Sequence, residues 1–467
     1  MADETVDKTE ETAGAGNDAT ADATAEETAV TAAETPVAGD ASELSEGDTA
    51  ATEAQVASEA TSVTAENVPD VREAMLIKPD VGFVKEIING GGTDLKKCYQ
   101  CATCSVVCNL TPDDSPFPRK EMMWAQWGLK DKLMGDPDVW LCHQCSDCVA
   151  QCPRGAKPGR VLQAIAKMTI SRFSWPGILG KGVGSPAALV LMVAIPVLIL
   201  LGVISQFGHL TNPSKGNIIL DGSGHQIVQD VKTGGEIIYS NFIPIPAVDI
   251  TFTLAFFFAI LAFAVGSSRY WKLLSAHAVS EGGTLKGSGL GNLGPVLGEI
   301  ITHKRFGKCD ETEDRKVSHM FIFYAFLGLF VTTAISVIGE YLLHKHSPYG
   351  WNNAVPVKWI GSVSAAAGLI GIGWIMINRF KHAAKIGIGA YFDWLLISVV
   401  ATVIVTGILA WGLRVANTPV AYTVYFIHLA SVLFLFIYAP FSKMAHMVYR
   451  TVALVFARVT GRDMGIE

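Results

Sequence analysis

Residues 98–108 read CYQCATCSVVC, and residues 142–153 read CHQCSDCVAQCP. Each stretch places four cysteines at the spacing C-x2-C-x2-C-x3-C, and together they hold eight of the nine cysteines of the chain. This spacing is typical of proteins with two [4Fe–4S] clusters, in which three cysteines of a stretch bind one cluster and the fourth reaches the other. We therefore predict an α-helical, ferredoxin-like domain that carries two [4Fe–4S] clusters.

The crossed fourth ligand divides the cysteines into two sets of four. One set combines the first three cysteines of the first stretch with the last of the second: Cys98, Cys101, Cys104 and Cys152. The other set combines the first three cysteines of the second stretch with the last of the first: Cys142, Cys145, Cys148 and Cys108. Structural zinc takes four ligands, normally as C-x2-C or Cys/His pairs, and would leave the third and fourth cysteine of each stretch without a role. A disulfide framework is typical of small secreted proteins, and the N-terminus has no secretory signal pattern. Cys309 stands alone, and we expect an ordinary thiol.

Six long apolar runs follow the cysteine stretches, and each has 19–24 residues. That length is enough for a helix to cross a hydrocarbon core of about 30 Å. Half of the chain is hydrophobic, only 17% is charged and the mean hydropathy is +0.35, which is too apolar for an ordinary soluble protein. The fold class is therefore mainly α, with a ferredoxin-like domain over 71–175 and a cytochrome-b-type bundle of six transmembrane helices over 176–446. The expected spans are 187–207, 247–267, 318–341, 359–377, 391–413 and 421–442.

Three further segments contain no predicted membrane span. Residues 1–70 contain 18 acidic residues and one lysine, with almost no large apolar side chain, so we predict a disordered acidic tail. The loop 208–246 has short apolar pieces on either side of residues 221–224 (DGSG), a pattern that indicates a small β-hairpin. Residues 447–467 mix apolar and basic side chains, so we expect a C-terminal segment along the inner membrane interface.

Lysine and arginine counts predict the orientation of the bundle. If the cysteine domain is cytoplasmic, the inner loops 268–317, 378–390 and 443–467 contain 15 basic residues, and the outer loops 208–246, 342–358 and 414–420 contain five. We therefore expect a multi-pass protein of the cytoplasmic membrane, in contact with membrane lipid, with both termini and both clusters on the cytoplasmic side.

Histidines in membrane helices are candidate haem ligands, because haem b takes one imidazole on each side of the iron. His428 and His446 are 18 residues apart, which is five helical turns, so we expect both to project from one face of a single helix, roughly 27 Å apart along its axis. His319 begins the third span at the level of His446, so this pair is our first choice for a haem near the clusters. His344 and His209 are possible partners of His428, and His303 suits only an inner site. The sequence leaves one haem b or two open.

A haem-containing membrane bundle that oxidises a quinol needs, besides the haem ligands, groups that accept the protons of the quinol. Glu340, Asp249 and Asp393 lie close to span ends, where a solvated carboxylate is the more common occurrence. No combination of nucleophile and general base indicates a bond-making catalytic residue, and nothing indicates a nucleic-acid partner. The spans hold too few polar residues for a transporter path.

The cysteine segment closely resembles the C subunits of heterodisulfide reductases. The residues that carry this resemblance are 117–122 (FPRKEM) and 140–155, which include Trp140-Leu141 before Cys142 and Pro153-Arg154-Gly155 after Cys152. The membrane part resembles the cytochrome-b partner of those reductases and, more distantly, the gamma subunit of respiratory nitrate reductase. In that relative one helix bears two haem-ligating histidines 18 residues apart, as His428 and His446 are here, and another bears two that are ten apart. The position ten after His319 is Leu329, so the fourth ligand is missing.

A fusion of these two parts is similar to the C subunits of the quinone-interacting membrane-bound oxidoreductase complexes (QmoC) of sulfate reducers. This resemblance implies a subunit that passes electrons between menaquinol and cytoplasmic flavin- and iron–sulfur-containing subunits through haem b and two [4Fe–4S] clusters, with adenylylsulfate reductase as the final acceptor. Two alternatives remain open: the fused membrane module of a heterodisulfide reductase-type complex, and a haem-free anchor for a ferredoxin domain.

Overall fold

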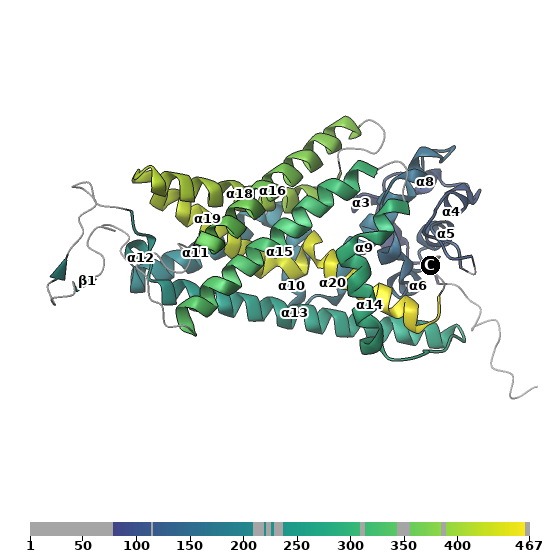
Figure 1. The fold of residues 1–467 in the computed structure, drawn as a ribbon. Coiled ribbons are helices and arrows are strands. Elements are labelled where there is room, and N and C mark those ends of the chain that lie inside the picture. Colours follow the sequence, from purple (N-terminus) through teal and green to yellow (C-terminus); the bar gives the residue numbers. More distant parts are fainter. Residues whose placement is uncertain are drawn as a thin grey trace, which may run out of the picture. The chain divides into compact units, whose positions relative to one another are not determined.

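The computed structural model describes residues 78–113, 115–208, 219–220, 226–227, 237–308, 313–342, 355–383 and 389–462. The predicted acidic tail lies outside these ranges. The described part is mainly helical and belongs to one compact unit, Ile77–Glu467 (Figure 1).

Short helices form the cysteine-rich segment. Their order is α3 (Val81–Asn89), η1 (Leu95–Lys97), α4 (Thr103–Val106), α5 (Arg119–Gln126), α6 (Lys130–Met134), α7 (Asp138–Leu141), α8 (Asp147–Ala150), α9 (Pro158–Phe173) and α10 (Gly177–Val183). Each cysteine stretch ends in a single helical turn, α4 or α8, and these two turns pack against each other. The longest helix, α9, has Pro158 at its first position, where a missing N–H is tolerated. It buries ten of its 16 residues, so it serves as the central support of the segment.

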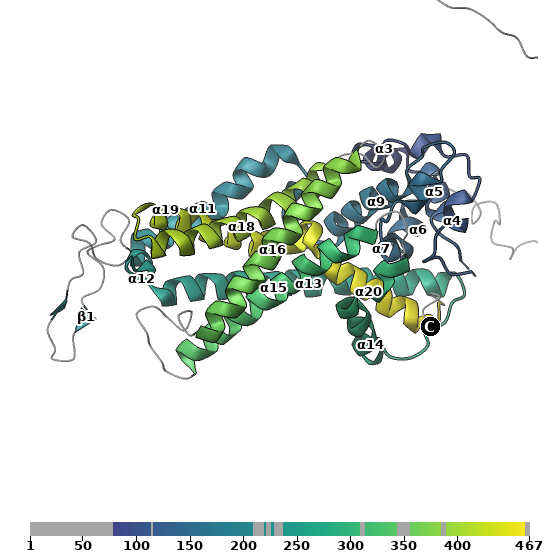
Figure 2. The same ribbon diagram turned by 45° about the horizontal axis from the view of Figure 1, so that its top comes forward.

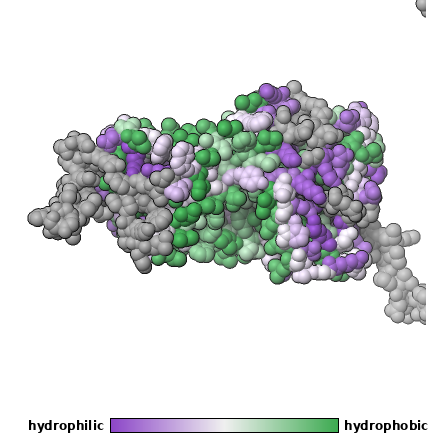
Figure 3. Space-filling model, in the orientation of Figure 1, coloured by the Kyte–Doolittle hydropathy of each residue, from purple (hydrophilic) through white to green (hydrophobic). Residues whose placement is uncertain are grey.

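Six helices are long and apolar enough to cross a membrane, as the sequence predicted. They are α11 (Leu189–Phe207), α13 (Ile245–Ser280), α15 (Glu313–Tyr341), α16 (Val355–Lys381), α18 (Tyr391–Val415) and α19 (Val420–Tyr438). Helices α15 and α16 pack along each other as a pair, and α16 also contacts α18, which packs on α19. The space-filling view shows apolar side chains over these helices and hydrophilic ones over the cysteine-rich segment (Figure 3).

Two helices differ from what the apolar runs indicated: α13 is longer than its run, and α14 lies outside all of the runs. Helix α13 continues 13 residues beyond the expected end at residue 267, because Gly266, Tyr270 and Leu274 repeat at four-residue intervals and are buried by protein. Helix α14 (Gly289–Thr302) lies in the predicted inner loop 268–317. It is too short to span a membrane, which is why a search for long runs misses it.

The helix that was expected to carry both His428 and His446 is broken, and that expectation is wrong. Helix α19 ends at Tyr438, two short 3-10 turns follow (η7, Ala439–Phe441; η8, Lys443–Ala445), and α20 (His446–Val459) begins at His446 itself. Pro440 explains the break, because proline has no N–H for the helix ladder and its ring clashes with the preceding turn. The two histidines therefore lie on different helices.

Helix α20 also differs from the expected interfacial segment. Seven of its 14 residues are buried, and it packs against α7, α13 and α14 (Figures 1 and 2). The Trp140 ring stacks on Tyr449 with ring centres 5.3 Å apart. Because side chains from several elements cover half of its residues, α20 connects the cysteine-rich segment to the membrane helices.

The remaining described elements are small. Strands β1 (Ile219–Leu220) and β2 (Gln226–Ile227) pair antiparallel with Ile219 opposite Ile227, which confirms the hairpin expected in this loop. Helix α12 (Tyr239–Phe242) and the 3-10 helices η2 (Pro186–Ala188) and η5 (Lys304–Lys308) complete the described part. One cluster of buried apolar residues extends from Phe83 in α3 to Val459 in α20, so the cysteine-rich segment and the membrane helices share a core.

Candidate redox site

The two cysteine loops have the same unusual backbone. In the first loop Gln100 and Ala102 have φ of 63° and 68°, and in the second Gln144 and Ser146 have φ of 53° and 80°. Positive φ is uncommon for residues other than glycine and marks a position that its surroundings hold in place. Such turns direct successive N–H groups into a concave surface that binds anions, including Fe–S clusters. Accordingly, the N–H of Gln144 donates to Cys142 Sγ at 3.3 Å.

The structure brings the cysteines together in the two predicted sets. A small pocket is lined by Cys98, Cys101, Cys104 and Cys152. In the other set burial, together with the nearby Cys145, raises the pKa of Cys108 to about 11 and that of Cys142 to about 12. Cys148 has a raised pKa for the same reasons, burial first and then Cys142 and Cys145. The eight cysteines between Cys98 and Cys152 form no disulfide.

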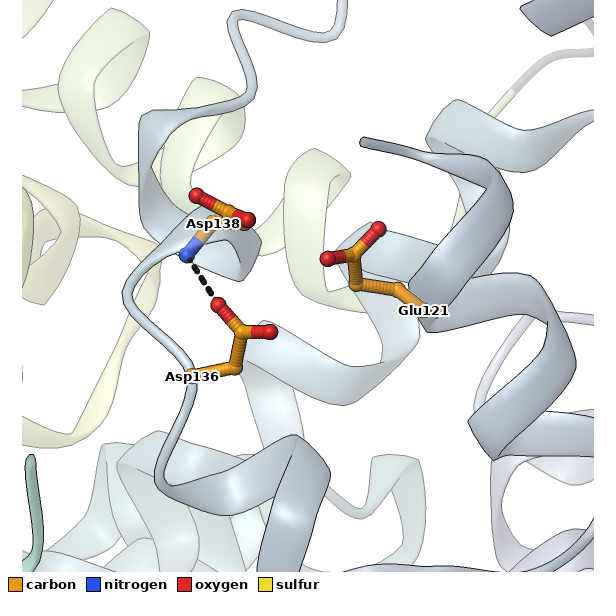
Figure 4. Close-up of side chains that lie close together, drawn as sticks. All are labelled: Glu121, Asp136 and Asp138. Carbon is orange, nitrogen blue, oxygen red and sulfur yellow. Dashed lines mark hydrogen bonds between the residues drawn. The ribbon is translucent and has the colours of Figure 1, made fainter. Parts of the chain in front are cut away.

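Three buried carboxyl groups of the cysteine-rich segment, those of Glu121, Asp136 and Asp138, lie close together (Figure 4). The Lys120 ammonium is 3.4 Å from Glu121, 2.9 Å from Asp136 and 3.0 Å from Asp138. Arg462, just after α20, adds a second cation at 2.6 Å from Asp138. Burial, together with the charges of the two aspartates, raises the pKa of Glu121 well above its usual range, which leaves two carboxylates for two cations. Because Lys120 contacts all three carboxyl groups, we assign this cluster no metal.

A cavity of about 1090 Å³ lies beside the second cysteine loop. Cys142 and His143 line it together with His319 of α15 and His446 of α20, and its inner part is apolar, with Phe323, Phe326, Ile372 and Val400 among its lining residues. Six basic residues line the cavity, against two acidic ones, Glu299 and Asp393. The basic residues are Arg160, Arg305, Arg315, Arg379, Lys443 and Arg450. This excess of positive charge favours an anionic ligand.

His319 and His446 face each other across this cavity, as the sequence predicted for the inner pair. Their ring centres are 6.4 Å apart. Two imidazoles that bind one metal ion from opposite sides, with metal–nitrogen bonds of about 2 Å and about 1 Å from each nitrogen to its ring centre, have ring centres roughly 6 Å apart. The observed separation is close to the value expected for two imidazoles that would hold one iron, such as that of haem b.

Hydrogen bonds fix which nitrogen of each histidine remains available. His303 Nδ1 lies 3.1 Å from the Ile301 carbonyl, which only accepts, so Nδ1 carries the proton and Nε2 accepts. His319 Nδ1 lies 3.0 Å from His303 Nε2 and therefore donates to it. His446 Nδ1 donates in the same way to the Lys443 carbonyl at 2.7 Å. Both His319 and His446 thus keep a lone pair on Nε2, as metal-ligating histidines with an oriented outer nitrogen do.

His428 does not line this cavity. It lies on α19, and its Nδ1 donates to the Val403 carbonyl of α18 at 3.1 Å, with Thr406 Oγ1 also at 3.1 Å. A carbon at Gly407 would come within 3.0 Å of its ring, so the glycine is what allows α18 to pack closely here. His344 and His209, the partners considered for His428, lie outside the described residues, as does Cys309.

The three acidic candidates have different surroundings. Asp393 is 2% exposed, accepts from Gln163 at 2.6 Å and pairs with Lys443, so it is a buried member of the cavity wall and not a solvated end residue. Asp249 accepts a hydrogen bond from the Tyr341 hydroxyl at 2.8 Å, which ties α13 to the end of α15. Glu340 lies next to Tyr341 near the end of α15.

The sequence-based prediction missed the positions of two residues at this site, His143 and His303. His143 directly follows a cysteine, and it is 6% exposed and lines the cavity. His303 was expected only at an inner site, but its contact with His319 depends on the αL conformation of His303 at the end of α14, where its φ is 52°. No periodicity in the sequence indicates that conformation.

Comparison with known proteins identifies both halves of the chain. A model described as a 4Fe-4S dicluster domain matches residues 94–156. A model described as citrate utilization protein B matches residues 224–465, about half of the chain. The eight cysteines thus lie in a dicluster domain and support two [4Fe–4S] clusters, attached to a region with six candidate membrane helices. No solved structure matches the chain.

Curated relatives match the cysteine-rich segment. The C subunit of the H2:CoB–CoM heterodisulfide, ferredoxin reductase of Methanothermobacter marburgensis is 33% identical over 106 residues, which cover 23% of this chain and 57% of the relative. A protein of Archaeoglobus profundus described as similar to the heterodisulfide reductase C subunit is 29% identical over 130 residues, or 26% of this chain and 68% of the relative. A C-type iron–sulfur subunit of the CoB–CoM heterodisulfide reductase of Methanocaldococcus jannaschii is 32% identical over 98 residues, or 19% and 52%. The chain spans a little over half the length of the first of these relatives.

Proposed function

The chain belongs to the citrate utilization protein B family, and on that basis we propose that it is the membrane electron-transfer subunit of a quinone-linked oxidoreductase complex. The first cluster is held by Cys98, Cys101, Cys104 and Cys152, and the second by Cys142, Cys145, Cys148 and Cys108. One haem b is held by His319 and His446. These groups supply one-electron redox chemistry when bound.

A single observation carries this proposal: one cavity is lined both by Cys142 of a cluster loop and by the facing imidazoles of His319 and His446. The protein's own residues position both sites. Arg315 donates to the carbonyls of His143 at 3.2 Å and of Gln144 at 2.6 Å, and it lies one helical turn before His319. The cluster loop and the ligand-bearing end of α15 are therefore held together directly.

The cavity also suits a lipid-soluble reductant. Five of its apolar lining residues are between 42% and 58% exposed, and they belong to α14, α15 and α20. These residues are Leu297, Ile301, Leu327, Phe330 and Met447. In a membrane such exposed apolar residues contact lipid, so a ligand with an apolar tail reaches this side of the cavity without crossing water. Menaquinol has these properties, and the buried Asp393 is a candidate for the group that receives its protons.

The resemblance supports the partners of this subunit, and the distribution of basic residues supports its orientation in the membrane. The clusters lie on the cytoplasmic side and pass electrons to flavin- and iron–sulfur-containing subunits, with adenylylsulfate reductase as final acceptor, as in the QmoC family. The heterodisulfide reductase relatives support a second candidate, a fused module for a disulfide-reducing partner. Co-purification followed by assays with adenylylsulfate and with the heterodisulfide separates the two candidates.

Spectroscopy of the purified chain tests the proposal. Wild type should hold about eight iron atoms in clusters and show a b-type α-band on reduction by a menaquinol analogue. His319→Ala and His446→Ala should lose that band, and His303→Ala should bind haem roughly 10–100-fold more weakly, because His303 orients His319. The control is His382→Ala, since His382 lines the cavity but bonds its own helix at Asn378. A preparation with full cluster iron and no b-type haem would overturn the proposal and support the alternative of a haem-free anchor for a ferredoxin domain. A second haem that disappears in His428→Ala would add a site outside the cavity.

A further inference from the structure

His143 is a buried polar side chain that points into the cavity without a partner. It is 6% exposed, and neither of its ring nitrogens has a hydrogen-bond partner among the described residues. Its ring contacts Phe306 edge-on, with ring centres 4.7 Å apart. A buried N–H without an acceptor has lost its hydrogen bond to water and gained none, so native structures rarely leave one unpaired. The missing acceptor therefore belongs to whatever the cavity binds.

Two arginines bracket the loop that carries His143. Arg315 donates to the His143 carbonyl at 3.2 Å, and Arg450 donates to the Leu141 carbonyl at 3.3 Å. Each arginine is four residues from a facing histidine, Arg315 before His319 and Arg450 after His446, so each lies one helical turn from it on the same face. The positive charge is thus concentrated where the cluster loop meets the histidine pair.

The acidic residues of the cavity are engaged elsewhere. Glu299 pairs with Arg305 at 2.9 Å and with Arg458, and Asp393 pairs with Lys443. Neither acidic side chain of the cavity is therefore left to accept from His143, and the nearby arginines favour an acceptor that carries a negative charge.

We propose that His143, with Arg315 and Arg450, forms a binding site for a carboxylate of the ligand in the cavity. This inference rests on the proposed function, under which the carboxylate is one of the two propionates of haem b. A neutral imidazole donates one N–H to that oxygen, and the guanidinium groups balance its charge. A quinol head group has no carboxylate, so it does not meet this requirement.

Comparing haem b with its dimethyl ester tests this site, because esterification removes the negative charges and leaves the iron ligands unchanged. Each form is exchanged into the full-length holoprotein, and the rate of loss to excess apomyoglobin is measured. Wild type should lose the ester at least about tenfold faster than haem b. In His143→Phe, which keeps the packing on Phe306, that ratio should fall severalfold. His143→Asn retains an N–H donor and should preserve most of it, and the matched control His277→Phe, on α13 outside the lining of the cavity, should leave it unchanged.

The outcomes separate this inference from the proposed function. Equal retention of haem b and its ester by wild type would overturn the carboxylate site, whatever the variants do. An unchanged ratio in His143→Phe, with the second cluster still visible by paramagnetic resonance, would overturn the role of His143. Absence of haem b from wild type would instead overturn the proposed function.

Discussion

The two cysteine loops share one backbone but lie in opposite surroundings. In the first loop Tyr99, the residue after the first cysteine, is 66% exposed, whereas its counterpart His143 in the second loop is 6% exposed. In each loop the carbonyl of the following glutamine accepts from an arginine. The partner of Gln100 is Arg119 from the same segment, at 3.0 Å, whereas the partner of Gln144 is Arg315 from the membrane helix α15, at 2.6 Å.

This difference indicates the order of the two clusters along the proposed electron path. The same four-cysteine motif faces solvent in one copy and the membrane cavity in the other. Under the proposed function, the second cluster would exchange electrons with the membrane ligand and the first with a soluble partner. Identical spacing thus has two roles, which are assigned by the residues that surround each loop.

Removing one cluster at a time gives the largest expected effect. Cys145→Ser and Cys101→Ser should each lower the cluster iron from about eight to about four atoms per chain, because each cysteine binds a single cluster. Iron analysis and low-temperature paramagnetic resonance measure this loss. Only Cys145→Ser should also remove magnetic broadening between a cluster and the haem. Cys309→Ser is the control and should change neither quantity. If Cys101→Ser changed the haem signal more than Cys145→Ser, the assignment of the loops would be reversed.

Lys120 holds the two loops relative to each other, and its loss gives the next largest effect. It lies on α5, which supports the first loop through Arg119, and it contacts Asp138 at the start of α7, which leads into the second loop. Lys120→Met should destabilise the cysteine-rich segment by about 3–5 kcal/mol, because it leaves buried carboxylates without their cation. Loss of cluster absorbance during denaturant unfolding in detergent measures this.

Lys132→Met is the matched control. Lys132 also lies over the Trp124 ring, at 5.4 Å against 5.0 Å for Lys120, but its partner Glu281 is about half exposed. An exposed pair contributes about 0–1 kcal/mol, so this variant should unfold nearly as wild type does. Equal effects of the two substitutions would show that the buried network does not hold the loops.

The smallest effect is expected at the exposed loop. The Arg154 guanidinium lies 4.0 Å from the centre of the Tyr99 ring, beside the first cluster. Arg154→Gln should slow electron transfer from reduced protein to its soluble partner roughly twofold to tenfold, more at low salt, because surface charges act mainly on association. Stopped-flow reoxidation measures the rate, with the exposed Val81→Ala as control. A slower reduction of the haem in Arg154→Gln would contradict the division of roles between the loops.

Local pattern in the sequence was enough to predict a domain with two clusters and six membrane spans. Cysteine spacing defined two sets of four that the structure brings together, because short loops leave few ways to surround a cluster. Apolar run length defined six spans, because a bilayer imposes one minimum length. The start of the third span also placed His319 at the level of His446, and in the structure the centres of the two rings lie 6.4 Å apart with their planes nearly perpendicular.

Contacts between distant segments settled what those patterns left open. The break at Pro440 separated His446 from His428, and the burial of α20 followed from packing against α7 and α14. The orientation of His319 by His303, and the difference between Tyr99 and His143, exist only because α14, α15 and the second loop meet at the cavity. Residue spacing does not contain this information, because it arises from the way separate helices pack.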